Sequence, residues 1–297
     1  MTNKAESLDA QEMPPVKKLA DRDAVIASIG ELSVNPRVIR LLSVALKHPD
    51  ADLTPAVMAM KTESVLTAAM LAACNSPTHY RGQRLVALEP AVLRLGLRET
   101  YRITLFITFR QGLRVSNLPD NRAADYLWSR AVTAACAMEM LTSATEVSPA
   151  AYTIGLLHAI GCFIIARNGS TLEGYDNTHP AALARAQEAA HGIAYPEAGA
   201  VALRQWDFPA EIWVPIRYQL SPQHAPEYQE QAKLLARAIS IAQFIEECRP
   251  ESPVYRESAS ADVFVNRFIQ DVEAHSLELL ECFYTRRPER PKWAKSA

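Results

Sequence analysis

His158 and Cys162 are the first candidates for chemistry, because Cys162 is the fourth residue after His158 in an apolar segment. At this spacing two side chains share one face of a helix, and a histidine beside a thiol can activate it as a nucleophile. The flanking residues Gly161, Phe163 and Ile164 favour burial of both side chains instead. We therefore expect no Cys-His nucleophile. His158 is interpreted as a hydrogen-bonded interior histidine, with a retained metal ligand or a contact in a ligand pocket as the alternatives.

Other catalytic and metal-binding patterns are absent from the sequence. It contains no GxSxG, GxxxxGK[ST], HExxH or GxGxxG motif. His191 stands beside Gly192 and His224 lies in a proline-flanked stretch, so we expect both at the surface. The cysteines are odd in number, widely spread and without a CxxC pair, which argues against a disulfide framework or a thiolate zinc site. They are Cys74, Cys136, Cys162, Cys248 and Cys282.

Aromatic and basic side chains offer two further candidates. Trp128, Trp206 and Trp213 could form an aromatic site, but packing between helices is the favoured interpretation. Residues 285–297 hold five basic residues, one acid and Trp293, a composition found in nucleic-acid and membrane contacts. A solubilising tail is the simpler interpretation of this segment.

Charge and hydropathy narrow the classes of function. The net charge of −2 and the pI near 6.4 provide no overall basic field to attract phosphates, so a nucleic-acid partner is not expected. The first residues lack the apolar core of a signal peptide, and the longest nearly apolar run, 152–166, is too short to cross a bilayer. We expect a cytoplasmic protein that does not bind membranes.

Helical patterns run through most of the chain and predict an all-α fold. Glycine is scarce, helix-forming residues recur, and no alternating segments with hairpin signals appear. The run from Ile103 to Phe109 would also suit a strand, but the absence of a partner strand favours a helix. Asp23 is the expected cap of the first helix. Helices are predicted at 23–29, 36–47, 54–60, 64–74, 89–96, 100–112, 128–141, 150–167, 180–191, 196–205, 209–218, 230–248 and 261–284.

These elements suggest a two-lobed bundle. We expect a flexible arm at 1–20 and a domain at 21–250, divided into lobes at 21–118 and 119–250 with a turn at 117–121. Residues 251–297 would hold a last helix and the basic tail. Whether this helix packs on the body or on a second chain stays open, as does the oligomeric state.

Ordered sequence segments resemble a known family. Leu127–Arg130, Gly155–Gly161 and Ala198–Gln219 are similar in order and spacing to the HD superfamily of helical phosphohydrolases, and closer to its HDOD branch. The resemblance covers roughly residues 30–250. The first lobe agrees through Leu41-Leu42, His48-Pro49-Asp50-Ala51, Cys74-Asn75-Ser76, Tyr80 and Leu95-Gly96-Leu97.

The resemblance implies a degenerate metal site. Catalytic relatives use histidines and a His-Asp pair to hold a metal that activates water. Here Arg130 stands at the first histidine position, His158-Ala159 replaces the His-Asp pair, Tyr195 replaces a later histidine, and Gln219-Leu220 replaces a final His-His pair. We therefore predict no catalytic residues, no metal and no cofactor, only a vestigial pocket formed by Arg130, His158, Tyr195, Arg217 and Gln219.

What the resemblance implies for function is a non-catalytic regulatory module in bacterial signalling, acting through a protein partner or a small ligand. If Arg130 and Arg217 both face the former site, they could receive a nucleotide or another anion. Two alternatives remain. One is a divergent metal-dependent phosphohydrolase built on His158 with His191 or His224. The other is a nucleic-acid-associated regulator that uses the basic tail.

Overall fold

Thirteen α-helices and one short 3-10 helix form the described part of the chain. A computed structural model describes residues 20–32, 34–48, 50–113, 122–143, 150–169, 179–247 and 263–283, and these contain no strand, which confirms the all-α prediction. Most of the 1–20 arm, the 117–121 turn, the 251–260 linker and the basic tail lie outside these residues. The helices are α1 Arg22–Ile29, α2 Arg37–Lys47, α3 Thr54–Lys61, α4 Ser64–Cys74, α5 Leu88–Gly112, α6 Arg122–Ser143, α7 Ala151–Leu157, α8 Ile160–Arg167, α9 Pro180–His191, α10 Tyr195–Gln205, α11 Ala210–Arg217, η1 Pro222–His224, α12 Gln229–Glu247 and α13 Val263–Phe283.

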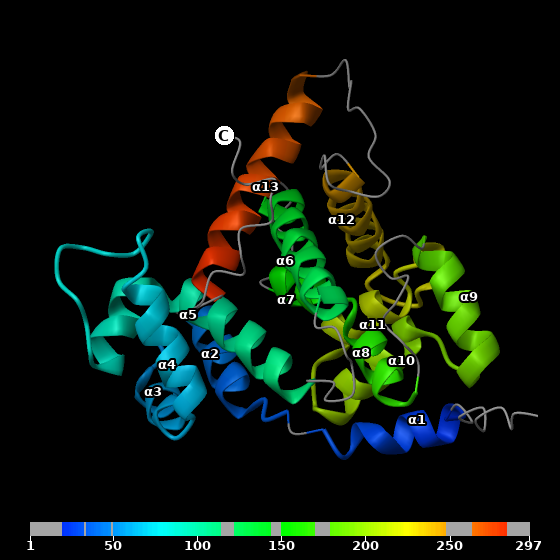
Figure 1. Ribbon diagram of the computed structural model, residues 1–297, viewed down its shortest axis with the longest axis horizontal. Helices are drawn as coiled ribbons and strands as arrows, with labels where there is room; N and C mark the ends of the chain where they lie inside the picture. Colours follow the sequence, from blue (N-terminus) through cyan, green and yellow to red (C-terminus); the bar gives the residue numbers. More distant parts are fainter. Residues whose placement is uncertain are drawn as a thin grey trace, which may run out of the picture.

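Helix α5 joins the two groups of helices visible in Figure 1. On one side it packs against α2 and α4, with α3 beside them; on the other lie α6 to α12. At Gly96 its backbone has φ 76° and ψ 165°, a conformation that side chains with a Cβ rarely adopt. The helices predicted at 89–96 and 100–112 are therefore the two halves of one kinked element.

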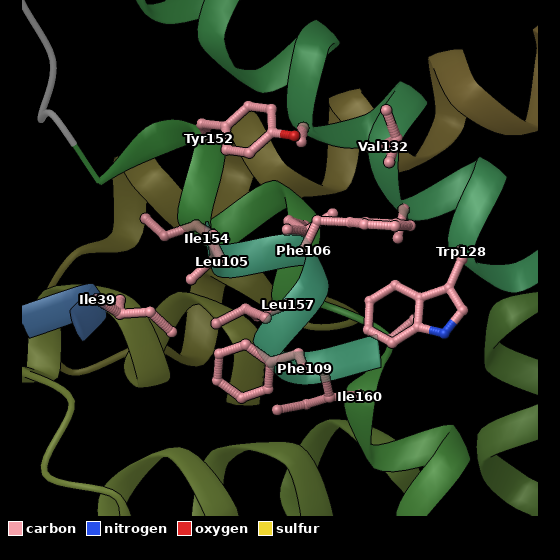
Figure 2. Close-up of a cluster of buried hydrophobic side chains, with 14 of the residues drawn as sticks. Ile39, Leu105, Phe106, Phe109, Trp128, Val132, Tyr152, Ile154, Leu157 and Ile160 are labelled. Atoms are coloured by element: carbon pink, nitrogen blue, oxygen red, sulfur yellow. The ribbon is translucent and has the colours of Figure 1, made fainter. Parts of the chain in front are cut away.

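The second half of α5 is buried on nearly every side. Phe106 meets Trp128 of α6 edge to face at 5.5 Å between ring centroids, and Phe109 lies 5.5 Å from the Trp206 ring at the end of α10. Figure 2 shows Phe106 pointing toward α6 and Phe109 lying near Leu157. Trp128 and Trp206 are thus core residues, as predicted. A helix buried all round has no polar stripe, which explains why this run could also pass for a strand.

A buried ionic cluster accompanies this aromatic core. Arg102 of α5 donates to Glu99 at 3.1 Å and also to Glu139 of α6, and its guanidinium lies 5.1 Å from the Tyr152 ring centroid. Burial raises the pKa of the neighbouring Cys136 thiol to about 12, so this cysteine stays protonated. Arg102 therefore compensates two carboxylates in the interface between α5 and α6.

The predicted helix at 150–167 is broken in the structure. Helix α7 ends at Leu157 and α8 begins at Ile160, with His158 and Ala159 between them. The expectation that His158 and Cys162 share one helical face is therefore wrong. Cys74, Cys136 and Cys162 are buried and form no disulfide among the described residues, whereas Cys248 and the side chain of Cys282 lie outside them.

Two glycines beside this break allow helices to touch backbone to backbone. A Cβ added at Gly155 would lie 2.5 Å from the Ala135 Cα of α6, and one added at Gly161 would lie 1.9 Å from the Tyr195 carbonyl oxygen of α10. Both distances are far below van der Waals contact. The small residues therefore set the spacing of α6 to α7 and of α8 to α10.

Both ends of the described chain pack on the body. Helix α1 lies against α8 and α10, so this segment, which we assigned to the first lobe, contacts the second (Figure 1). Asp21, not the predicted Asp23, caps it by accepting from the Ala24 N–H at 3.0 Å. Helix α13 packs on α6, α4, α5 and α12, so it contacts the body of its own chain.

No single helix among the described residues is long and apolar enough to span a membrane. The pair α3 and α4 reaches the required length and composition only together, and the two are bent by 112° at their junction.

Replacement of Gly161 by alanine should destabilise the protein by about 3 kcal/mol or more, because the new methyl group collides with backbone that side-chain movement cannot relieve. The measurement is the free energy of unfolding in urea. Gly30→Ala is the matched control: its Cβ would meet nothing closer than 3.6 Å, and we expect a change within about 0.5 kcal/mol. Equal effects of the two substitutions would refute the close-packing argument.

Arg102→Leu should cost about 3–5 kcal/mol of unfolding free energy, because Glu99 would keep a buried carboxylate without its cation. Arg110→Leu on the same helix breaks a more exposed ion pair, 2.8 Å from Asp125, and should cost about 1 kcal/mol. Chemical denaturation measures the free energy of unfolding of both variants. If the two substitutions lower it by similar amounts, Arg102, Glu99 and Glu139 do not act as a buried ionic cluster.

Candidate functional site

Four of the five residues assigned to the vestigial pocket gather where α6, α7, α10 and α11 meet. Arg130, His158, Tyr195 and Gln219 are all at least nine-tenths buried. Burial is the main cause of the pKa shifts of His158 and Tyr195, and Arg130 is close enough for its positive charge to act on both: it adds to the lowering of the pKa of His158 and opposes the raising of the pKa of Tyr195. Gln219 bonds to the backbone of His158. Four of the residues named from the sequence therefore lie together, with their side chains packed into the interior.

His158 is held as a neutral ring. Its Nδ1 lies 2.7 Å from the Gly155 carbonyl oxygen, and since a carbonyl can only accept, Nδ1 carries the proton and donates. Only 2% of the residue is exposed. Desolvation, with a smaller contribution from Arg130, lowers the pKa of His158 to about 4. This is the hydrogen-bonded interior histidine favoured from the sequence.

Gln219 forms a hydrogen bond with a backbone carbonyl at the break between α7 and α8. Its Nε2 donates to the His158 carbonyl at 3.0 Å and to the Ile216 carbonyl at 2.8 Å. Because the chain turns at His158, a side chain from the end of α11 takes over bonding that an unbroken helix would supply. Its Oε1 is buried without a partner among the described residues. Gln219 thus joins α11 to the α7–α8 junction.

Tyr195 begins α10 directly against α8. Its backbone N–H donates to Oε1 of Gln187 at 2.9 Å, which supplies the cap that α10 lacks from its own residues. Burial raises the pKa of the Tyr195 hydroxyl well above its usual range, so the phenol stays neutral. Tyr195 therefore contributes a packed aromatic ring and no titratable group near neutral pH.

Arg217 lies apart from this buried cluster. Its guanidinium is 3.5 Å from Glu197 and about as exposed as that of Arg22, which also donates to Glu197 at 2.7 Å. The hydrogen bond from Arg22, helped by the positive charge of both arginines, lowers the pKa of Glu197, which remains ionised. Arg217 thus joins the surface ion pair between Arg22 of α1 and Glu197 of α10. These contacts give no support to the expectation that Arg130 and Arg217 bind one anion together.

The remaining histidines do not complete a metal site. His191 is buried, contrary to expectation, because its Nδ1 donates to the Ala20 carbonyl at 2.7 Å and thereby holds the segment before α1. His224 is exposed in η1, as predicted. In the part of the chain that the structure describes, no group of three His, Cys, Asp or Glu side chains is placed to hold a metal ion. The residues present therefore do not fit the metal centre of the catalytic relatives.

Several connecting residues escaped the sequence analysis. Gln187, Glu197 and Arg22 belong to α9, α10 and α1, and more than 150 residues separate the last two in the sequence. Asn168 also reaches from the end of α8 to Ser28 at 2.8 Å. No local pattern marks such pairs. The single available signal was Glu197 in the first turn of a predicted helix, where a carboxylate is favourable in any case.

The stability of the protein should fall as the pH is lowered from about 6.5 toward 4. The pKa of His158 is lower in the folded chain than its ordinary value, so the unfolded chain binds the proton first in this window. The loss should reach about 3 kcal/mol at pH 4. Urea unfolding at a series of pH values from about 7.5 down to 4 measures this loss. His158→Gln should flatten this dependence and His224→Gln should not; an equal slope in all three proteins would remove His158 as the cause.

The comparisons with known proteins agree with this architecture. A protein from Shewanella amazonensis SB2B, described as a candidate phosphohydrolase, matches with a TM-score of 0.63 and 18% identity over 88% of this chain and 98% of its own. A Marinobacter aquaeolei VT8 protein, described as a candidate signal transduction protein, gives 0.61 and 18% over 88% and 61%. At such identities the likeness concerns the fold.

Family membership rests on two further findings. An HDOD domain protein of unknown function from Geobacter sulfurreducens matches with a TM-score of 0.52 and 20% identity over 88% of this chain and 93% of its own. Among proteins of curated function, no match is found. The HDOD domain itself matches residues 32–222, which is more than half of the chain. This chain therefore belongs to the HDOD family.

Proposed function

We propose that this HDOD protein is a non-catalytic regulatory module that acts by binding a signalling protein. The observation that carries the proposal is the state of the former metal site: His158 donates through Nδ1 to the Gly155 carbonyl, and Gln219 bonds to the backbone beside it. The buried guanidinium of Arg130 adds positive charge to this place. A divalent cation would meet one imidazole and a repelling charge.

The burial of the same cluster favours a protein partner over a small ligand. Tyr195, His158 and Gln219 are almost inaccessible, and Arg217 is engaged with Glu197 at the surface. A shallow hollow of about 450 Å³ lies elsewhere, between α6 and α12, and is lined by Leu141, Ala236, Arg237, Ser240 and Ile241. Because Arg130, His158, Tyr195 and Gln219 are at least nine-tenths buried, a nucleotide has little access to them, and a rigid scaffold is the contribution that we assign to this site.

The two alternatives receive less support. A divergent phosphohydrolase needs His158 to converge with His191 or His224, but His191 is bonded to Ala20 and His224 is exposed in η1. The nucleic-acid alternative depends on residues 285–297, which lie outside the described residues, and so stays a prediction. Its signature would be binding that weakens steeply with salt and is lost on deletion of that segment.

The proposal predicts that protein purified without chelator holds less than about 0.1 equivalent of Mn, Fe or Zn per chain. We expect no hydrolysis of bis(p-nitrophenyl) phosphate above the His158→Gln background, with or without added Mn²⁺. Elemental analysis and the chromogenic assay measure the two quantities.

Ala159→Asp is the internal control for this experiment, because it places one carboxylate beside His158 and should raise metal retention above that of the wild type. Stoichiometric metal in the wild type, or turnover that disappears in His158→Gln, would contradict the proposal and favour the phosphohydrolase.

A further inference from the structure

Large apolar side chains are exposed to solvent where α3 and α5 meet. Lys61, the last residue of α3, pairs with Glu89 in the first turn of α5. Met58 lies one turn before Lys61, and Leu93 lies one turn after Glu89, so both flank this ion pair. They are 57% and 78% exposed. Exposed residues of this size on adjoining helix faces indicate a binding surface.

The loop between α4 and α5 adds to this surface from a fixed position. Figure 1 shows it projecting from the first lobe. The Asn75 side chain forms hydrogen bonds with both backbone groups of Leu85: it accepts from the Leu85 N–H at 2.9 Å and donates to the Leu85 carbonyl at 2.8 Å. Arg94 donates to the Gln83 carbonyl at 2.8 Å. With Leu85 turned toward the core, its neighbours Arg84 and Val86 face outward, and Val86 is 84% exposed.

This surface is positively charged in a chain that is acidic overall. The sequence from residue 64 to residue 88 contains no Asp or Glu, whereas Arg81 and Arg84 are both exposed. Arg81 donates to the backbone carbonyls of Thr78 and Tyr80, and no ion pair is described for either arginine. The nearest acid in the sequence, Glu89, is already paired with Lys61. Two guanidinium groups therefore remain available to carboxylates.

We propose that Met58, Arg81, Arg84, Val86 and Leu93 form a docking surface for an acidic amphipathic segment of a partner protein. Aliphatic side chains between arginines match a helix that carries apolar residues on one face and carboxylates at its border. Nucleic acid fits less well, because Val86 and Leu93 cannot stack on bases and two arginines neutralise few phosphates. This inference rests on the proposed function and specifies its partner.

The test uses a phage library of random 16-residue peptides, selected on the full-length protein. Enriched sequences should combine Asp or Glu with apolar residues at helical spacing. The best peptide, measured by fluorescence anisotropy, should bind at least about tenfold more weakly to Arg81→Glu/Arg84→Glu and to Leu93→Ser. It should also bind more weakly at higher salt.

Matched substitutions on other faces control for nonspecific effects. Arg185→Glu/Arg204→Glu reverses the same charge at exposed positions of α9 and α10, and Val44→Ser removes an equally apolar exposed residue of α2. Both should leave peptide affinity unchanged, with unaltered circular dichroism in every variant.

Three results would overturn the proposal. Basic or neutral peptides could be enriched, the docking and control variants could lose affinity equally, or Leu93→Ser could abolish self-association of the wild type, which would identify a second copy as the occupant. If the wild type is metal-free and inactive and one of these three results is found, the proposed function stands and only the proposed docking surface is rejected. Hydrolytic turnover that depends on His158 would instead remove the function.

Discussion

Burial of the second half of α5 between the two lobes is the constraint on which the other contacts depend. Phe106 and Phe109 meet Trp128 and Trp206 inside the protein, so both lobes share one apolar core. A helix buried in this way has no solvent-facing side for its polar residues. Arg102 is consequently compensated within the protein by Glu99 and Glu139. Before the kink at Gly96, the first half of the helix buries Ala91 and Val92 and exposes Leu93.

Close approach of backbones provides the second structural principle. Gly161 lets α8 touch the start of α10, and Gly155 lets α7 touch α6. Such contacts leave little free volume, and His158 and Gln219 each donate a hydrogen bond to a backbone carbonyl beside the break. Gln219 and Gln187 each bond to a backbone group near a helix end. The helical scaffold can therefore stay rigid around His158.

The interior and the surface consequently play different parts. The cluster of Arg130, His158, Tyr195 and Gln219 is buried, and Arg130 is its charged member, which suits a structural role. The first lobe, by contrast, presents Val86 and Leu93 to solvent from a loop and a helix that are both held in place. A preformed surface loses little conformational freedom on binding, which favours recognition by a regulatory partner. The proposed function follows from this combination.

The sequence by itself determined the helical class, most helix positions, the family and the four residues that meet around His158, because periodicity and ordered motifs are local or short-range signals. It misplaced Asp23 as a cap, ran one helix through His158 and expected His191 at the surface. Only the tertiary structure decided these points. The break at His158 depends on contacts with α10 and α11, and the burial of His191 depends on Ala20, 171 residues away. Contacts between such distant residues leave no periodic trace, because each is fixed by packing of the whole chain.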